Sequence, residues 1–125
     1  MSTYAGTHSP NAYRANSVLT ATRGQLVVML YDGATRFLSQ ASVAMGEHEI
    51  MAAHNKLTRA ENIIRHLRNT LDLEQGQIAA RLESIYTFSL AHLRQARLDQ
   101  SPRKVDEVNE MLTKLRASWA AIAAE

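Results

Sequence analysis

The stretch IMAAHNKLTRAENIIRHLRNTL, residues 50–71, decides the fold class of this chain. On a helix of 3.6 residues per turn, apolar residues spaced by alternating steps of three and four fall on one face, whereas a strand has a period of two. The stretch follows those helical steps without a miss, and we predict an amphipathic helix over about 49–71. Its apolar positions are Ile50, Ala53, Leu57, Ala60, Ile64, Leu67 and Leu71.

A second helix is predicted before this stretch. Thr22 and Gln25 have the spacing of a capping box, in which each side chain bonds the backbone N–H of the other residue. The helix is expected over about 22–45, with Gly46 as its C-terminal cap. Before it, residues 1–17 are rich in Ser, Thr, Ala, Gly and Asn and show no helical period, so we expect a mobile N-terminal arm.

Two further helices are predicted after a break at Asp72–Gly76. The apolar rhythm that starts with Ile78 and Leu82 predicts a helix over about 75–98. Ser101-Pro102 places a preferred N-cap residue before a proline at the first helical position, and so starts a helix over about 102–122. The apolar positions of this last helix are Val105, Val108, Leu112, Leu115, Trp119 and Ile122.

Four amphipathic helices with short connections favour an antiparallel up-and-down four-helix bundle, because short loops force successive helices to lie side by side. No segment has the alternation of a strand, so the predicted class is all-α. At 125 residues, with 46% hydrophobic residues, the chain is long enough to bury one core. We therefore expect residues 1–125 to form a single helical domain.

The composition and the N-terminal sequence indicate the cellular compartment. The chain has no cysteine, which excludes disulfide bonds and thiol chemistry and is consistent with a reducing compartment. Met1–Pro10 lacks the basic and apolar regions of a secretory signal, and no apolar run approaches the roughly 20 residues that span a bilayer. We expect a cytoplasmic protein.

The sequence offers no catalytic or metal-binding constellation. A di-iron bundle needs a Glu followed by a His three residues later on two helices. A His three residues later is missing after Glu49, Glu61, Glu74 and Glu83. The apolar stripes over 49–71 and 102–122 contain no carboxylate. The histidines show no ligand spacing, and His92, near a core stripe, is expected to bond to backbone or water. We predict no enzyme, no metal and no cofactor.

The helix over 22–45 has more apolar surface than one bundle face covers. Around a stripe centred on Leu30, the arc extends to Val27 and Tyr31 on one side and to Met29 on the other. Ile63 and Phe88 similarly lie roughly 120° from the core centres of their own helices. Surplus apolar positions of this kind indicate a groove for a partner.

Gly33 lies in the middle of the predicted first helix. A glycine there costs about 1 kcal/mol relative to alanine, so it indicates close approach by another backbone. That backbone belongs either to a neighbouring helix of the bundle or to a bound peptide.

The motifs Asn16-Ser17-Val18-Leu19 and Leu30-Tyr31-Asp32-Gly33-Ala34 closely resemble those of the FliS family of flagellar secretion chaperones, and the likeness extends from Tyr13 to Trp119. The resemblance implies a helical bundle that binds the disordered C-terminal segment of flagellin and prevents its premature polymerisation. It further implies contact with the flagellar export gate, and a regulator or co-chaperone is another possible partner. The N-terminal arm is expected to lie over part of the client groove in the free protein.

The apolar arc and the resemblance together mark the residues expected to contact a partner. They are Tyr13, Asn16, Ser17, Val18, Leu19, Leu26, Val27, Met29, Leu30, Tyr31, Gly33, Ile63, Tyr86 and Phe88. For Tyr31 and Tyr86, packing inside the bundle is the competing interpretation.

Two alternatives remain open from the sequence. One is a protein that binds RNA or a membrane surface through Arg59, Arg65, Arg68, Arg81, Arg94 and Arg97. These arginines share their helices with Glu61 and Glu83, so a solvated face is the better account, and we expect neither a nucleic-acid partner nor stable membrane insertion. The other alternative is a self-assembling bundle that buries its surplus arc in a dimer. We expect a monomer or a weak homodimer.

Overall fold

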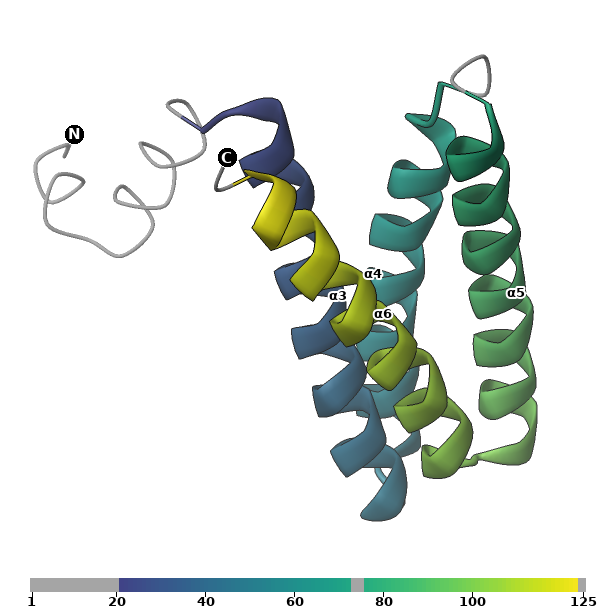
Figure 1. The fold of residues 1–125 in the computed structure, drawn as a ribbon. Helices are drawn as coiled ribbons and strands as arrows, with labels where there is room; N and C mark the ends of the chain where they lie inside the picture. Colours follow the sequence, from purple (N-terminus) through teal and green to yellow (C-terminus); the bar gives the residue numbers. More distant parts are fainter. Residues whose placement is uncertain (1–20, 73–75, 124–125) are drawn as a thin grey trace, which may run out of the picture.

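The computed structural model describes residues 21–72 and 76–123, which form four α-helices and no strand (Figure 1). The expected mobile arm, residues 1–17, lies outside this range. The helices are α3 (Arg23–Gly46), α4 (Ile50–Asn69), α5 (Gln77–Asp99) and α6 (Pro102–Ala123). The prediction of an all-α four-helix bundle is confirmed. No helix end differs from its predicted position by more than two residues, the largest differences being Asn69 against 71 and Gln77 against 75.

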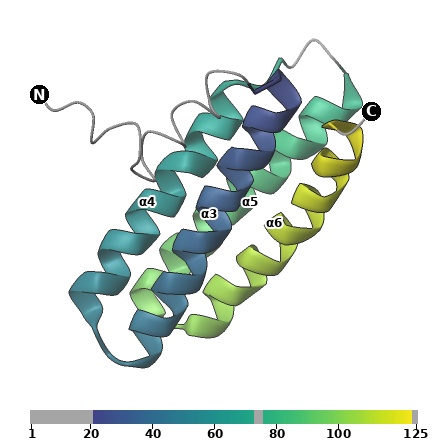
Figure 2. The ribbon, with the colours of Figure 1, turned by 90° about the vertical axis from the view of Figure 1, so that its left-hand side faces the viewer.

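Successive helices run in opposite directions, and the bundle is unevenly packed. Helix α3 packs closely against both α4 and α6, whereas α5 makes sparser contact with those same two helices. Figure 2 shows α3 flanked by α4 and α6, with α5 behind it. The order around the bundle is therefore α3, α4, α5, α6, and α5 is the least tightly held helix.

The predicted N-terminal signals of two helices are confirmed. At the start of α3, the Gln25 backbone N–H donates to Thr22 Oγ1 at 3.1 Å, and the Thr22 N–H donates to Gln25 Oε1 at 2.9 Å. At the start of α6, the Lys104 backbone N–H donates to Ser101 Oγ at 3.3 Å. These bonds satisfy N–H groups that have no partner within the helix.

The predicted cap at Gly46 is wrong. Gly46 is the last residue of α3, and Glu47 is the C-cap. The left-handed conformation in this turn belongs to His48, with φ of 61°. The turn therefore does not use the conformational freedom of the glycine.

The core contains side chains from all four helices. Burying a side chain of the size of Leu or Ile stabilises the fold by about 1.5–3 kcal/mol before the entropy of ordering it is subtracted. The largest fully buried apolar side chains are Tyr31, Tyr86, Leu38, Leu57, Ile64, Leu93, Leu112, Val105 and Val108.

Two isoleucines assigned to core stripes are instead exposed. Ile50, at the first position of α4, is 59% exposed, and Ile78, in the first turn of α5, is 73% exposed. Both lie at helix ends. For Ile78 the end is that of the least tightly held helix, so no neighbour covers the side chain.

The apolar stripe of α4 does contain a carboxylate, contrary to the prediction. Glu61 is only 5% exposed and accepts two hydrogen bonds from the Arg97 guanidinium of α5, at 2.8 and 2.9 Å. Arg97 also donates to Thr58 Oγ1 at 3.3 Å and to His54 Nδ1 at 3.1 Å. A buried carboxylate needs such partners, so Arg97 is a structural residue here and not part of a solvated face.

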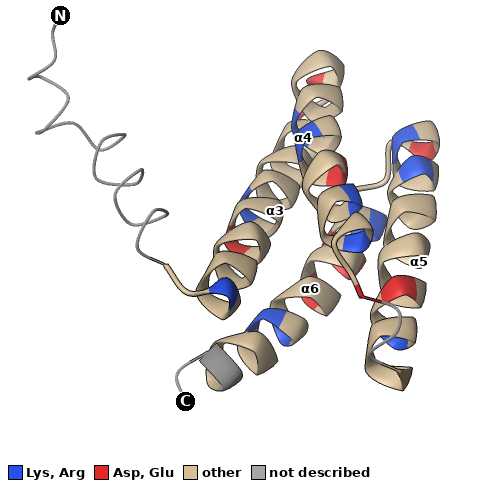
Figure 3. Ribbon diagram, turned by 90° about the horizontal axis from the view of Figure 1, so that it is seen from above, with Lys and Arg blue, Asp and Glu red and all other residues tan. Residues whose placement is uncertain are grey.

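Polar contacts also connect α6 to its two neighbours. Arg116 Nε donates to Asp32 Oδ1 of α3 at 2.9 Å, and His92 of α5 bonds to Glu107 Oε1 at 2.7 Å. The His92 partner is thus a carboxylate, not the expected backbone or water. Over the helices as a whole, Figure 3 shows Lys and Arg interspersed with Asp and Glu. None of the four described helices is both long and apolar enough to cross a bilayer.

Candidate partner-binding site

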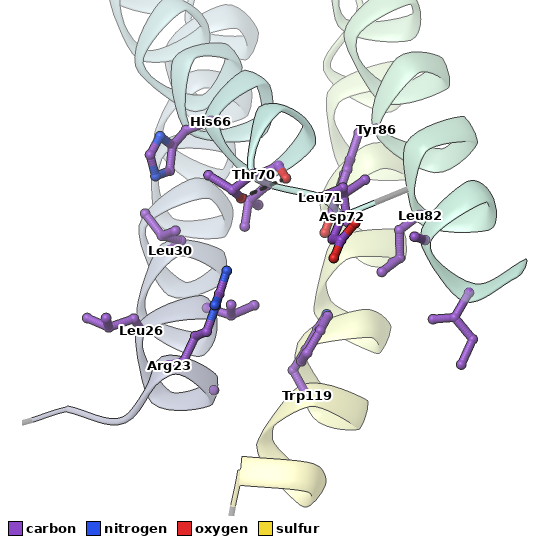
Figure 4. A pocket seen from close by; sticks show the side chains of 15 residues that line it. Arg23, Leu26, Leu30, His66, Thr70, Leu71, Asp72, Leu82, Tyr86 and Trp119 are labelled. Carbon is purple, nitrogen blue, oxygen red and sulfur yellow. Dashed lines mark hydrogen bonds between the residues drawn. The ribbon is translucent and has the colours of Figure 1, made fainter. Parts of the chain in front are cut away.

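An open cavity of about 700 Å³ lies at the end of the bundle where α3 begins, α4 ends and α5 begins (Figure 4). Trp119, near the end of α6, completes its wall. The sparse packing of α5 against its neighbours leaves this space. The lining residues are Arg23, Gly24, Leu26, Val27, Leu30, His66, Leu67, Thr70, Leu71, Asp72, Ile78, Ala79, Leu82, Tyr86 and Trp119.

Most of the cavity wall is apolar. Leu26 and Leu30 come from α3, Leu82 from α5 and the Trp119 indole from α6, as Figure 4 shows. Cavities of about 300–1,000 Å³ with apolar walls and a few polar groups are typical binding sites. This one can receive several apolar side chains of a partner.

The hydroxyl group of Tyr86 bonds to a second tyrosine behind the wall. Tyr86 Oη lies 2.5 Å from Tyr31 Oη, and the two rings meet edge to face with centroids 6.4 Å apart. Burial raises the pKa of Tyr31, although hydrogen bonding with Tyr86 and Trp119 opposes the rise. Burial also raises the pKa of Tyr86, and the hydrogen bond and charge of Tyr31 raise it further. Both phenols are therefore uncharged at neutral pH, and the pair adds no charge to the wall.

Four of the residues expected to contact a partner meet at this cavity. Leu26, Val27 and Leu30 of α3 are half-buried and line it, and Tyr86 of α5 is buried behind its surface. Tyr31 lies wholly in the core, where its packing and its bond to Tyr86 account for it.

The other expected contact residues lie elsewhere or outside the described range. Phe88 is 54% exposed and stacks on His92 at a centroid distance of 5.1 Å, away from the cavity lining. Met29 is half-buried and does not line the cavity. Outside the described residues lie Tyr13, Asn16, Ser17, Val18 and Leu19.

Gly33 is close to a side chain and not, as predicted, to a backbone. A Cβ atom added to Gly33 would lie 3.2 Å from Ile63 Cδ1 of α4. Ile63 is half-buried and packs against the core. The glycine therefore allows α3 and α4 to approach each other closely.

Apart from Tyr86, sequence reasoning missed the α4, α5 and α6 walls of the cavity. Leu71, Ile78, Leu82 and Trp119 were assigned to core stripes, because the helical period gives the same signal for a core position and for a cavity wall. The distance between helices, which the period does not report, decides between the two.

The described residues include no cluster of three or more His, Cys, Asp or Glu that could hold a metal ion. What the cavity offers a partner is burial of apolar surface, with polar groups at Arg23, His66, Thr70 and Asp72. Together, the fold and the cavity define an all-α four-helix bundle with an open, largely apolar cavity at one end.

Comparison with known proteins gives the particular family. The sequence model described as "Flagellar protein FliS" matches residues 6–125. The flagellar secretion chaperone FliS of Bacillus subtilis is 32% identical over 108 residues, which cover 86% of this chain and 80% of the relative. The FliS proteins of Salmonella typhimurium and Vibrio cholerae are each 32% identical, over 86% and 94% of this chain and 82% and 90% of theirs. The chain belongs to the FliS family, which is a family of chaperones and not of enzymes.

Proposed function

We propose that this protein is a flagellar secretion chaperone whose client is flagellin, and that the C-terminal segment of flagellin fills the cavity with apolar side chains. The observation that carries the proposal is the cavity itself: about 700 Å³ of open, largely apolar space between α3, α4, α5 and α6. A monomeric bundle has no structural need for such a space, since close packing stabilises a core. The relatives are named as secretion chaperones, which supports the same role here.

The mechanism is coupled folding and binding. A client segment that is disordered alone forms helical turns as it lays its apolar face against Leu26, Leu30 and the opposing α5 wall. Covering that face blocks the contacts through which flagellin subunits polymerise. The complex acts in the cytoplasm and presents the client to the flagellar export gate.

We further propose that the N-terminal arm, which lies outside the described residues, regulates access to the site. In this proposal residues 1–17, with Tyr13 and Asn16, and the adjoining Val18 compete with the client for the groove. Deleting the arm should therefore strengthen or accelerate client binding. Weaker binding after the deletion would make the arm a direct contact.

Isothermal titration with a peptide of about 40 residues from the flagellin C-terminus tests the proposal. A large negative heat-capacity change, with helicity gained on binding and most of the binding free energy kept at high salt, is the expected result. Steep loss of affinity with salt would favour a polyanion binder. No heat and no co-elution would overturn the proposal, and a mass that rises with concentration would then point to self-assembly.

A further inference from the structure

The outer face of the α3/α4 pair carries three cations around one aromatic ring. Arg36 Cζ, Lys56 Nζ and Arg59 Cζ lie 5.4, 5.7 and 5.6 Å from the centroid of the half-buried Phe37 ring. At such distances the ring attracts each cation and restricts its position. We call Arg36, Lys56 and Arg59 with Phe37 the basic face.

The basic face has no carboxylate partner within the part of the chain that the structure describes. The ion pairs there involve His92, Arg97, Lys104, Lys114 and Arg116. Arg59 Nε donates only to the neutral amide oxygen of Asn55, at 3.1 Å. The nearest acidic residue along α3, Asp32, is engaged by Arg116 on the side facing α6. The cations of the basic face therefore have unused capacity to bind acceptors.

The basic face continues the wall of the cavity. Leu30 and His66 line the cavity, Gly33 and Ile63 meet one turn farther along, and Phe37 follows. From Leu30 to Phe37 the rise along α3 is about 10 Å. A segment that leaves the cavity along the α3/α4 contact therefore reaches the basic face within two helical turns.

We propose that the basic face binds acidic side chains of the same client segment, just beyond the part that fills the cavity. The proposal rests on the proposed function and adds a charge requirement to the apolar one. Carboxylates accept charge-assisted hydrogen bonds from guanidinium and ammonium groups, and the aromatic ring holds the donors in place for them. Opposite charge at one end also fixes the direction in which the client lies along α3.

The structure favours an acidic peptide over a nucleic acid at this face. Bases bind proteins by stacking on free aromatic rings, and here three cations surround the half-buried Phe37 ring. Three cations also form a short patch compared with the extended basic groove that tracks a nucleic-acid backbone.

The test compares two triple variants of equal net charge. Arg36→Gln, Lys56→Gln and Arg59→Gln neutralise the basic face, whereas Arg94→Gln, Arg103→Gln and Lys114→Gln neutralise exposed cations of α5 and α6. In about 50 mM salt, we expect the first variant to bind the flagellin peptide about three- to tenfold more weakly than wild type, and the control to bind within about twofold. In about 500 mM salt the difference between the variants should disappear. Circular dichroism and the urea midpoint show that both are folded.

A variant peptide, with its acidic residues replaced by their amides, completes a double-mutant cycle. Wild type should lose the same factor with this peptide, and the basic-face variant should lose nothing further. Two results would overturn the charge requirement and leave the proposed function standing. One is that the peptide and protein substitutions reduce the affinity additively. The other is that wild type binds the peptide while both triple variants have equal affinities at low salt. Failure of wild type to bind any flagellin peptide would overturn both. If the basic-face variant lost binding to a single-stranded RNA but bound the peptide as wild type does, the face would instead be assigned to nucleic acid.

Discussion

The hydroxyl oxygens of Tyr31 and Tyr86 lie 2.5 Å apart inside the bundle and connect α3 to α5, two helices that are not neighbours in the packing order. Both side chains are almost wholly buried. The bond satisfies two hydroxyl groups that burial would otherwise leave without water. It also ties the loosely packed α5 to the best-packed helix, directly behind the cavity.

The two hydroxyl groups should have non-additive effects on the free energy of unfolding. Tyr31→Phe and Tyr86→Phe should each lower the free energy of unfolding by about 1–3 kcal/mol, because each takes the tyrosine partner away from a buried hydroxyl group. The double variant should cost less than the sum of the two single variants. Urea denaturation measures all three. Strictly additive losses would mean that the hydroxyl groups do not interact in solution.

Breaking the Glu61–Arg97 pair should strongly destabilise the fold. Arg97→Met should lower the free energy of unfolding by about 2–4 kcal/mol, because it leaves a buried carboxylate unpaired. The loss should be smaller than for a fully buried ion pair, because Arg97 is partly exposed. Glu61→Leu combined with Arg97→Met should recover most of the loss. Lys114→Ala, which breaks an exposed pair with Glu110, is the control and should leave the urea midpoint unchanged. A single Arg97 variant as stable as that control would rule out a structural role for the pair.

Gly33 and Ile63 should show coupled effects on stability. Gly33→Ala gains up to about 1 kcal/mol of helix propensity but crowds Ile63 Cδ1, so its net effect should be small. Ile63→Val removes that atom. In the Ile63→Val background, Gly33→Ala should therefore stabilise the protein by about 0.5–1 kcal/mol. Urea denaturation measures both effects. An equal effect of Gly33→Ala in both backgrounds would show that contact with Ile63 Cδ1 does not restrict the residue at position 33.

Ile78 and Leu98 provide a matched test of the cavity. Both belong to α5 and both are 73% exposed, but only Ile78 lines the cavity. Ile78→Ser should weaken binding of the flagellin peptide about three- to tenfold, because it removes apolar area that the client buries. Leu98→Ser should leave the affinity unchanged. Titration calorimetry measures both, and equal effects of the two substitutions would place the client elsewhere.

Glu107 should make the free energy of unfolding depend on pH under acidic conditions. Its hydrogen bond with His92 lowers its pKa from the ordinary 4.5, with smaller contributions from Arg103 and Lys104. A lowered pKa means that ionised Glu107 stabilises the folded state above pH 4.5 and that this stabilisation is lost as the pH falls through the folded-state pKa. The stability advantage of wild type over Glu107→Gln should shrink as the pH falls from about 6 to about 3.

The Glu107 carboxyl group can also be followed directly. Titration by NMR should give a pKa below 4.5 in wild type, and His92→Ala should move it back towards that value. A pKa that His92→Ala leaves unchanged would show that the hydrogen bond does not hold in solution.

The sequence alone determined the elements of the bundle. Thr22 with Gln25, and Ser101-Pro102, mark helix starts through bonds between residues three apart, which are the same whatever packs around them. The three-and-four rhythm over 50–71 likewise fixes which face of α4 turns inward. Leu26, Val27, Leu30 and Tyr86 could be placed at the candidate site because the apolar arc and the family resemblance pointed to them.

Only the tertiary structure decided which apolar residues form the core and which form the cavity. Ile78 and Leu93 belong to the same predicted helix, yet Ile78 is exposed beside the cavity and Leu93 is fully buried. The period fixes the direction of a side chain around its own helix but not the distance to the next helix. For the same reason, the rhythm did not reveal that Glu61 is buried, since its partner Arg97 lies 36 residues away along the chain. Local sequence sets local hydrogen bonds and facing, whereas burial and ion pairing depend on where the other helices lie.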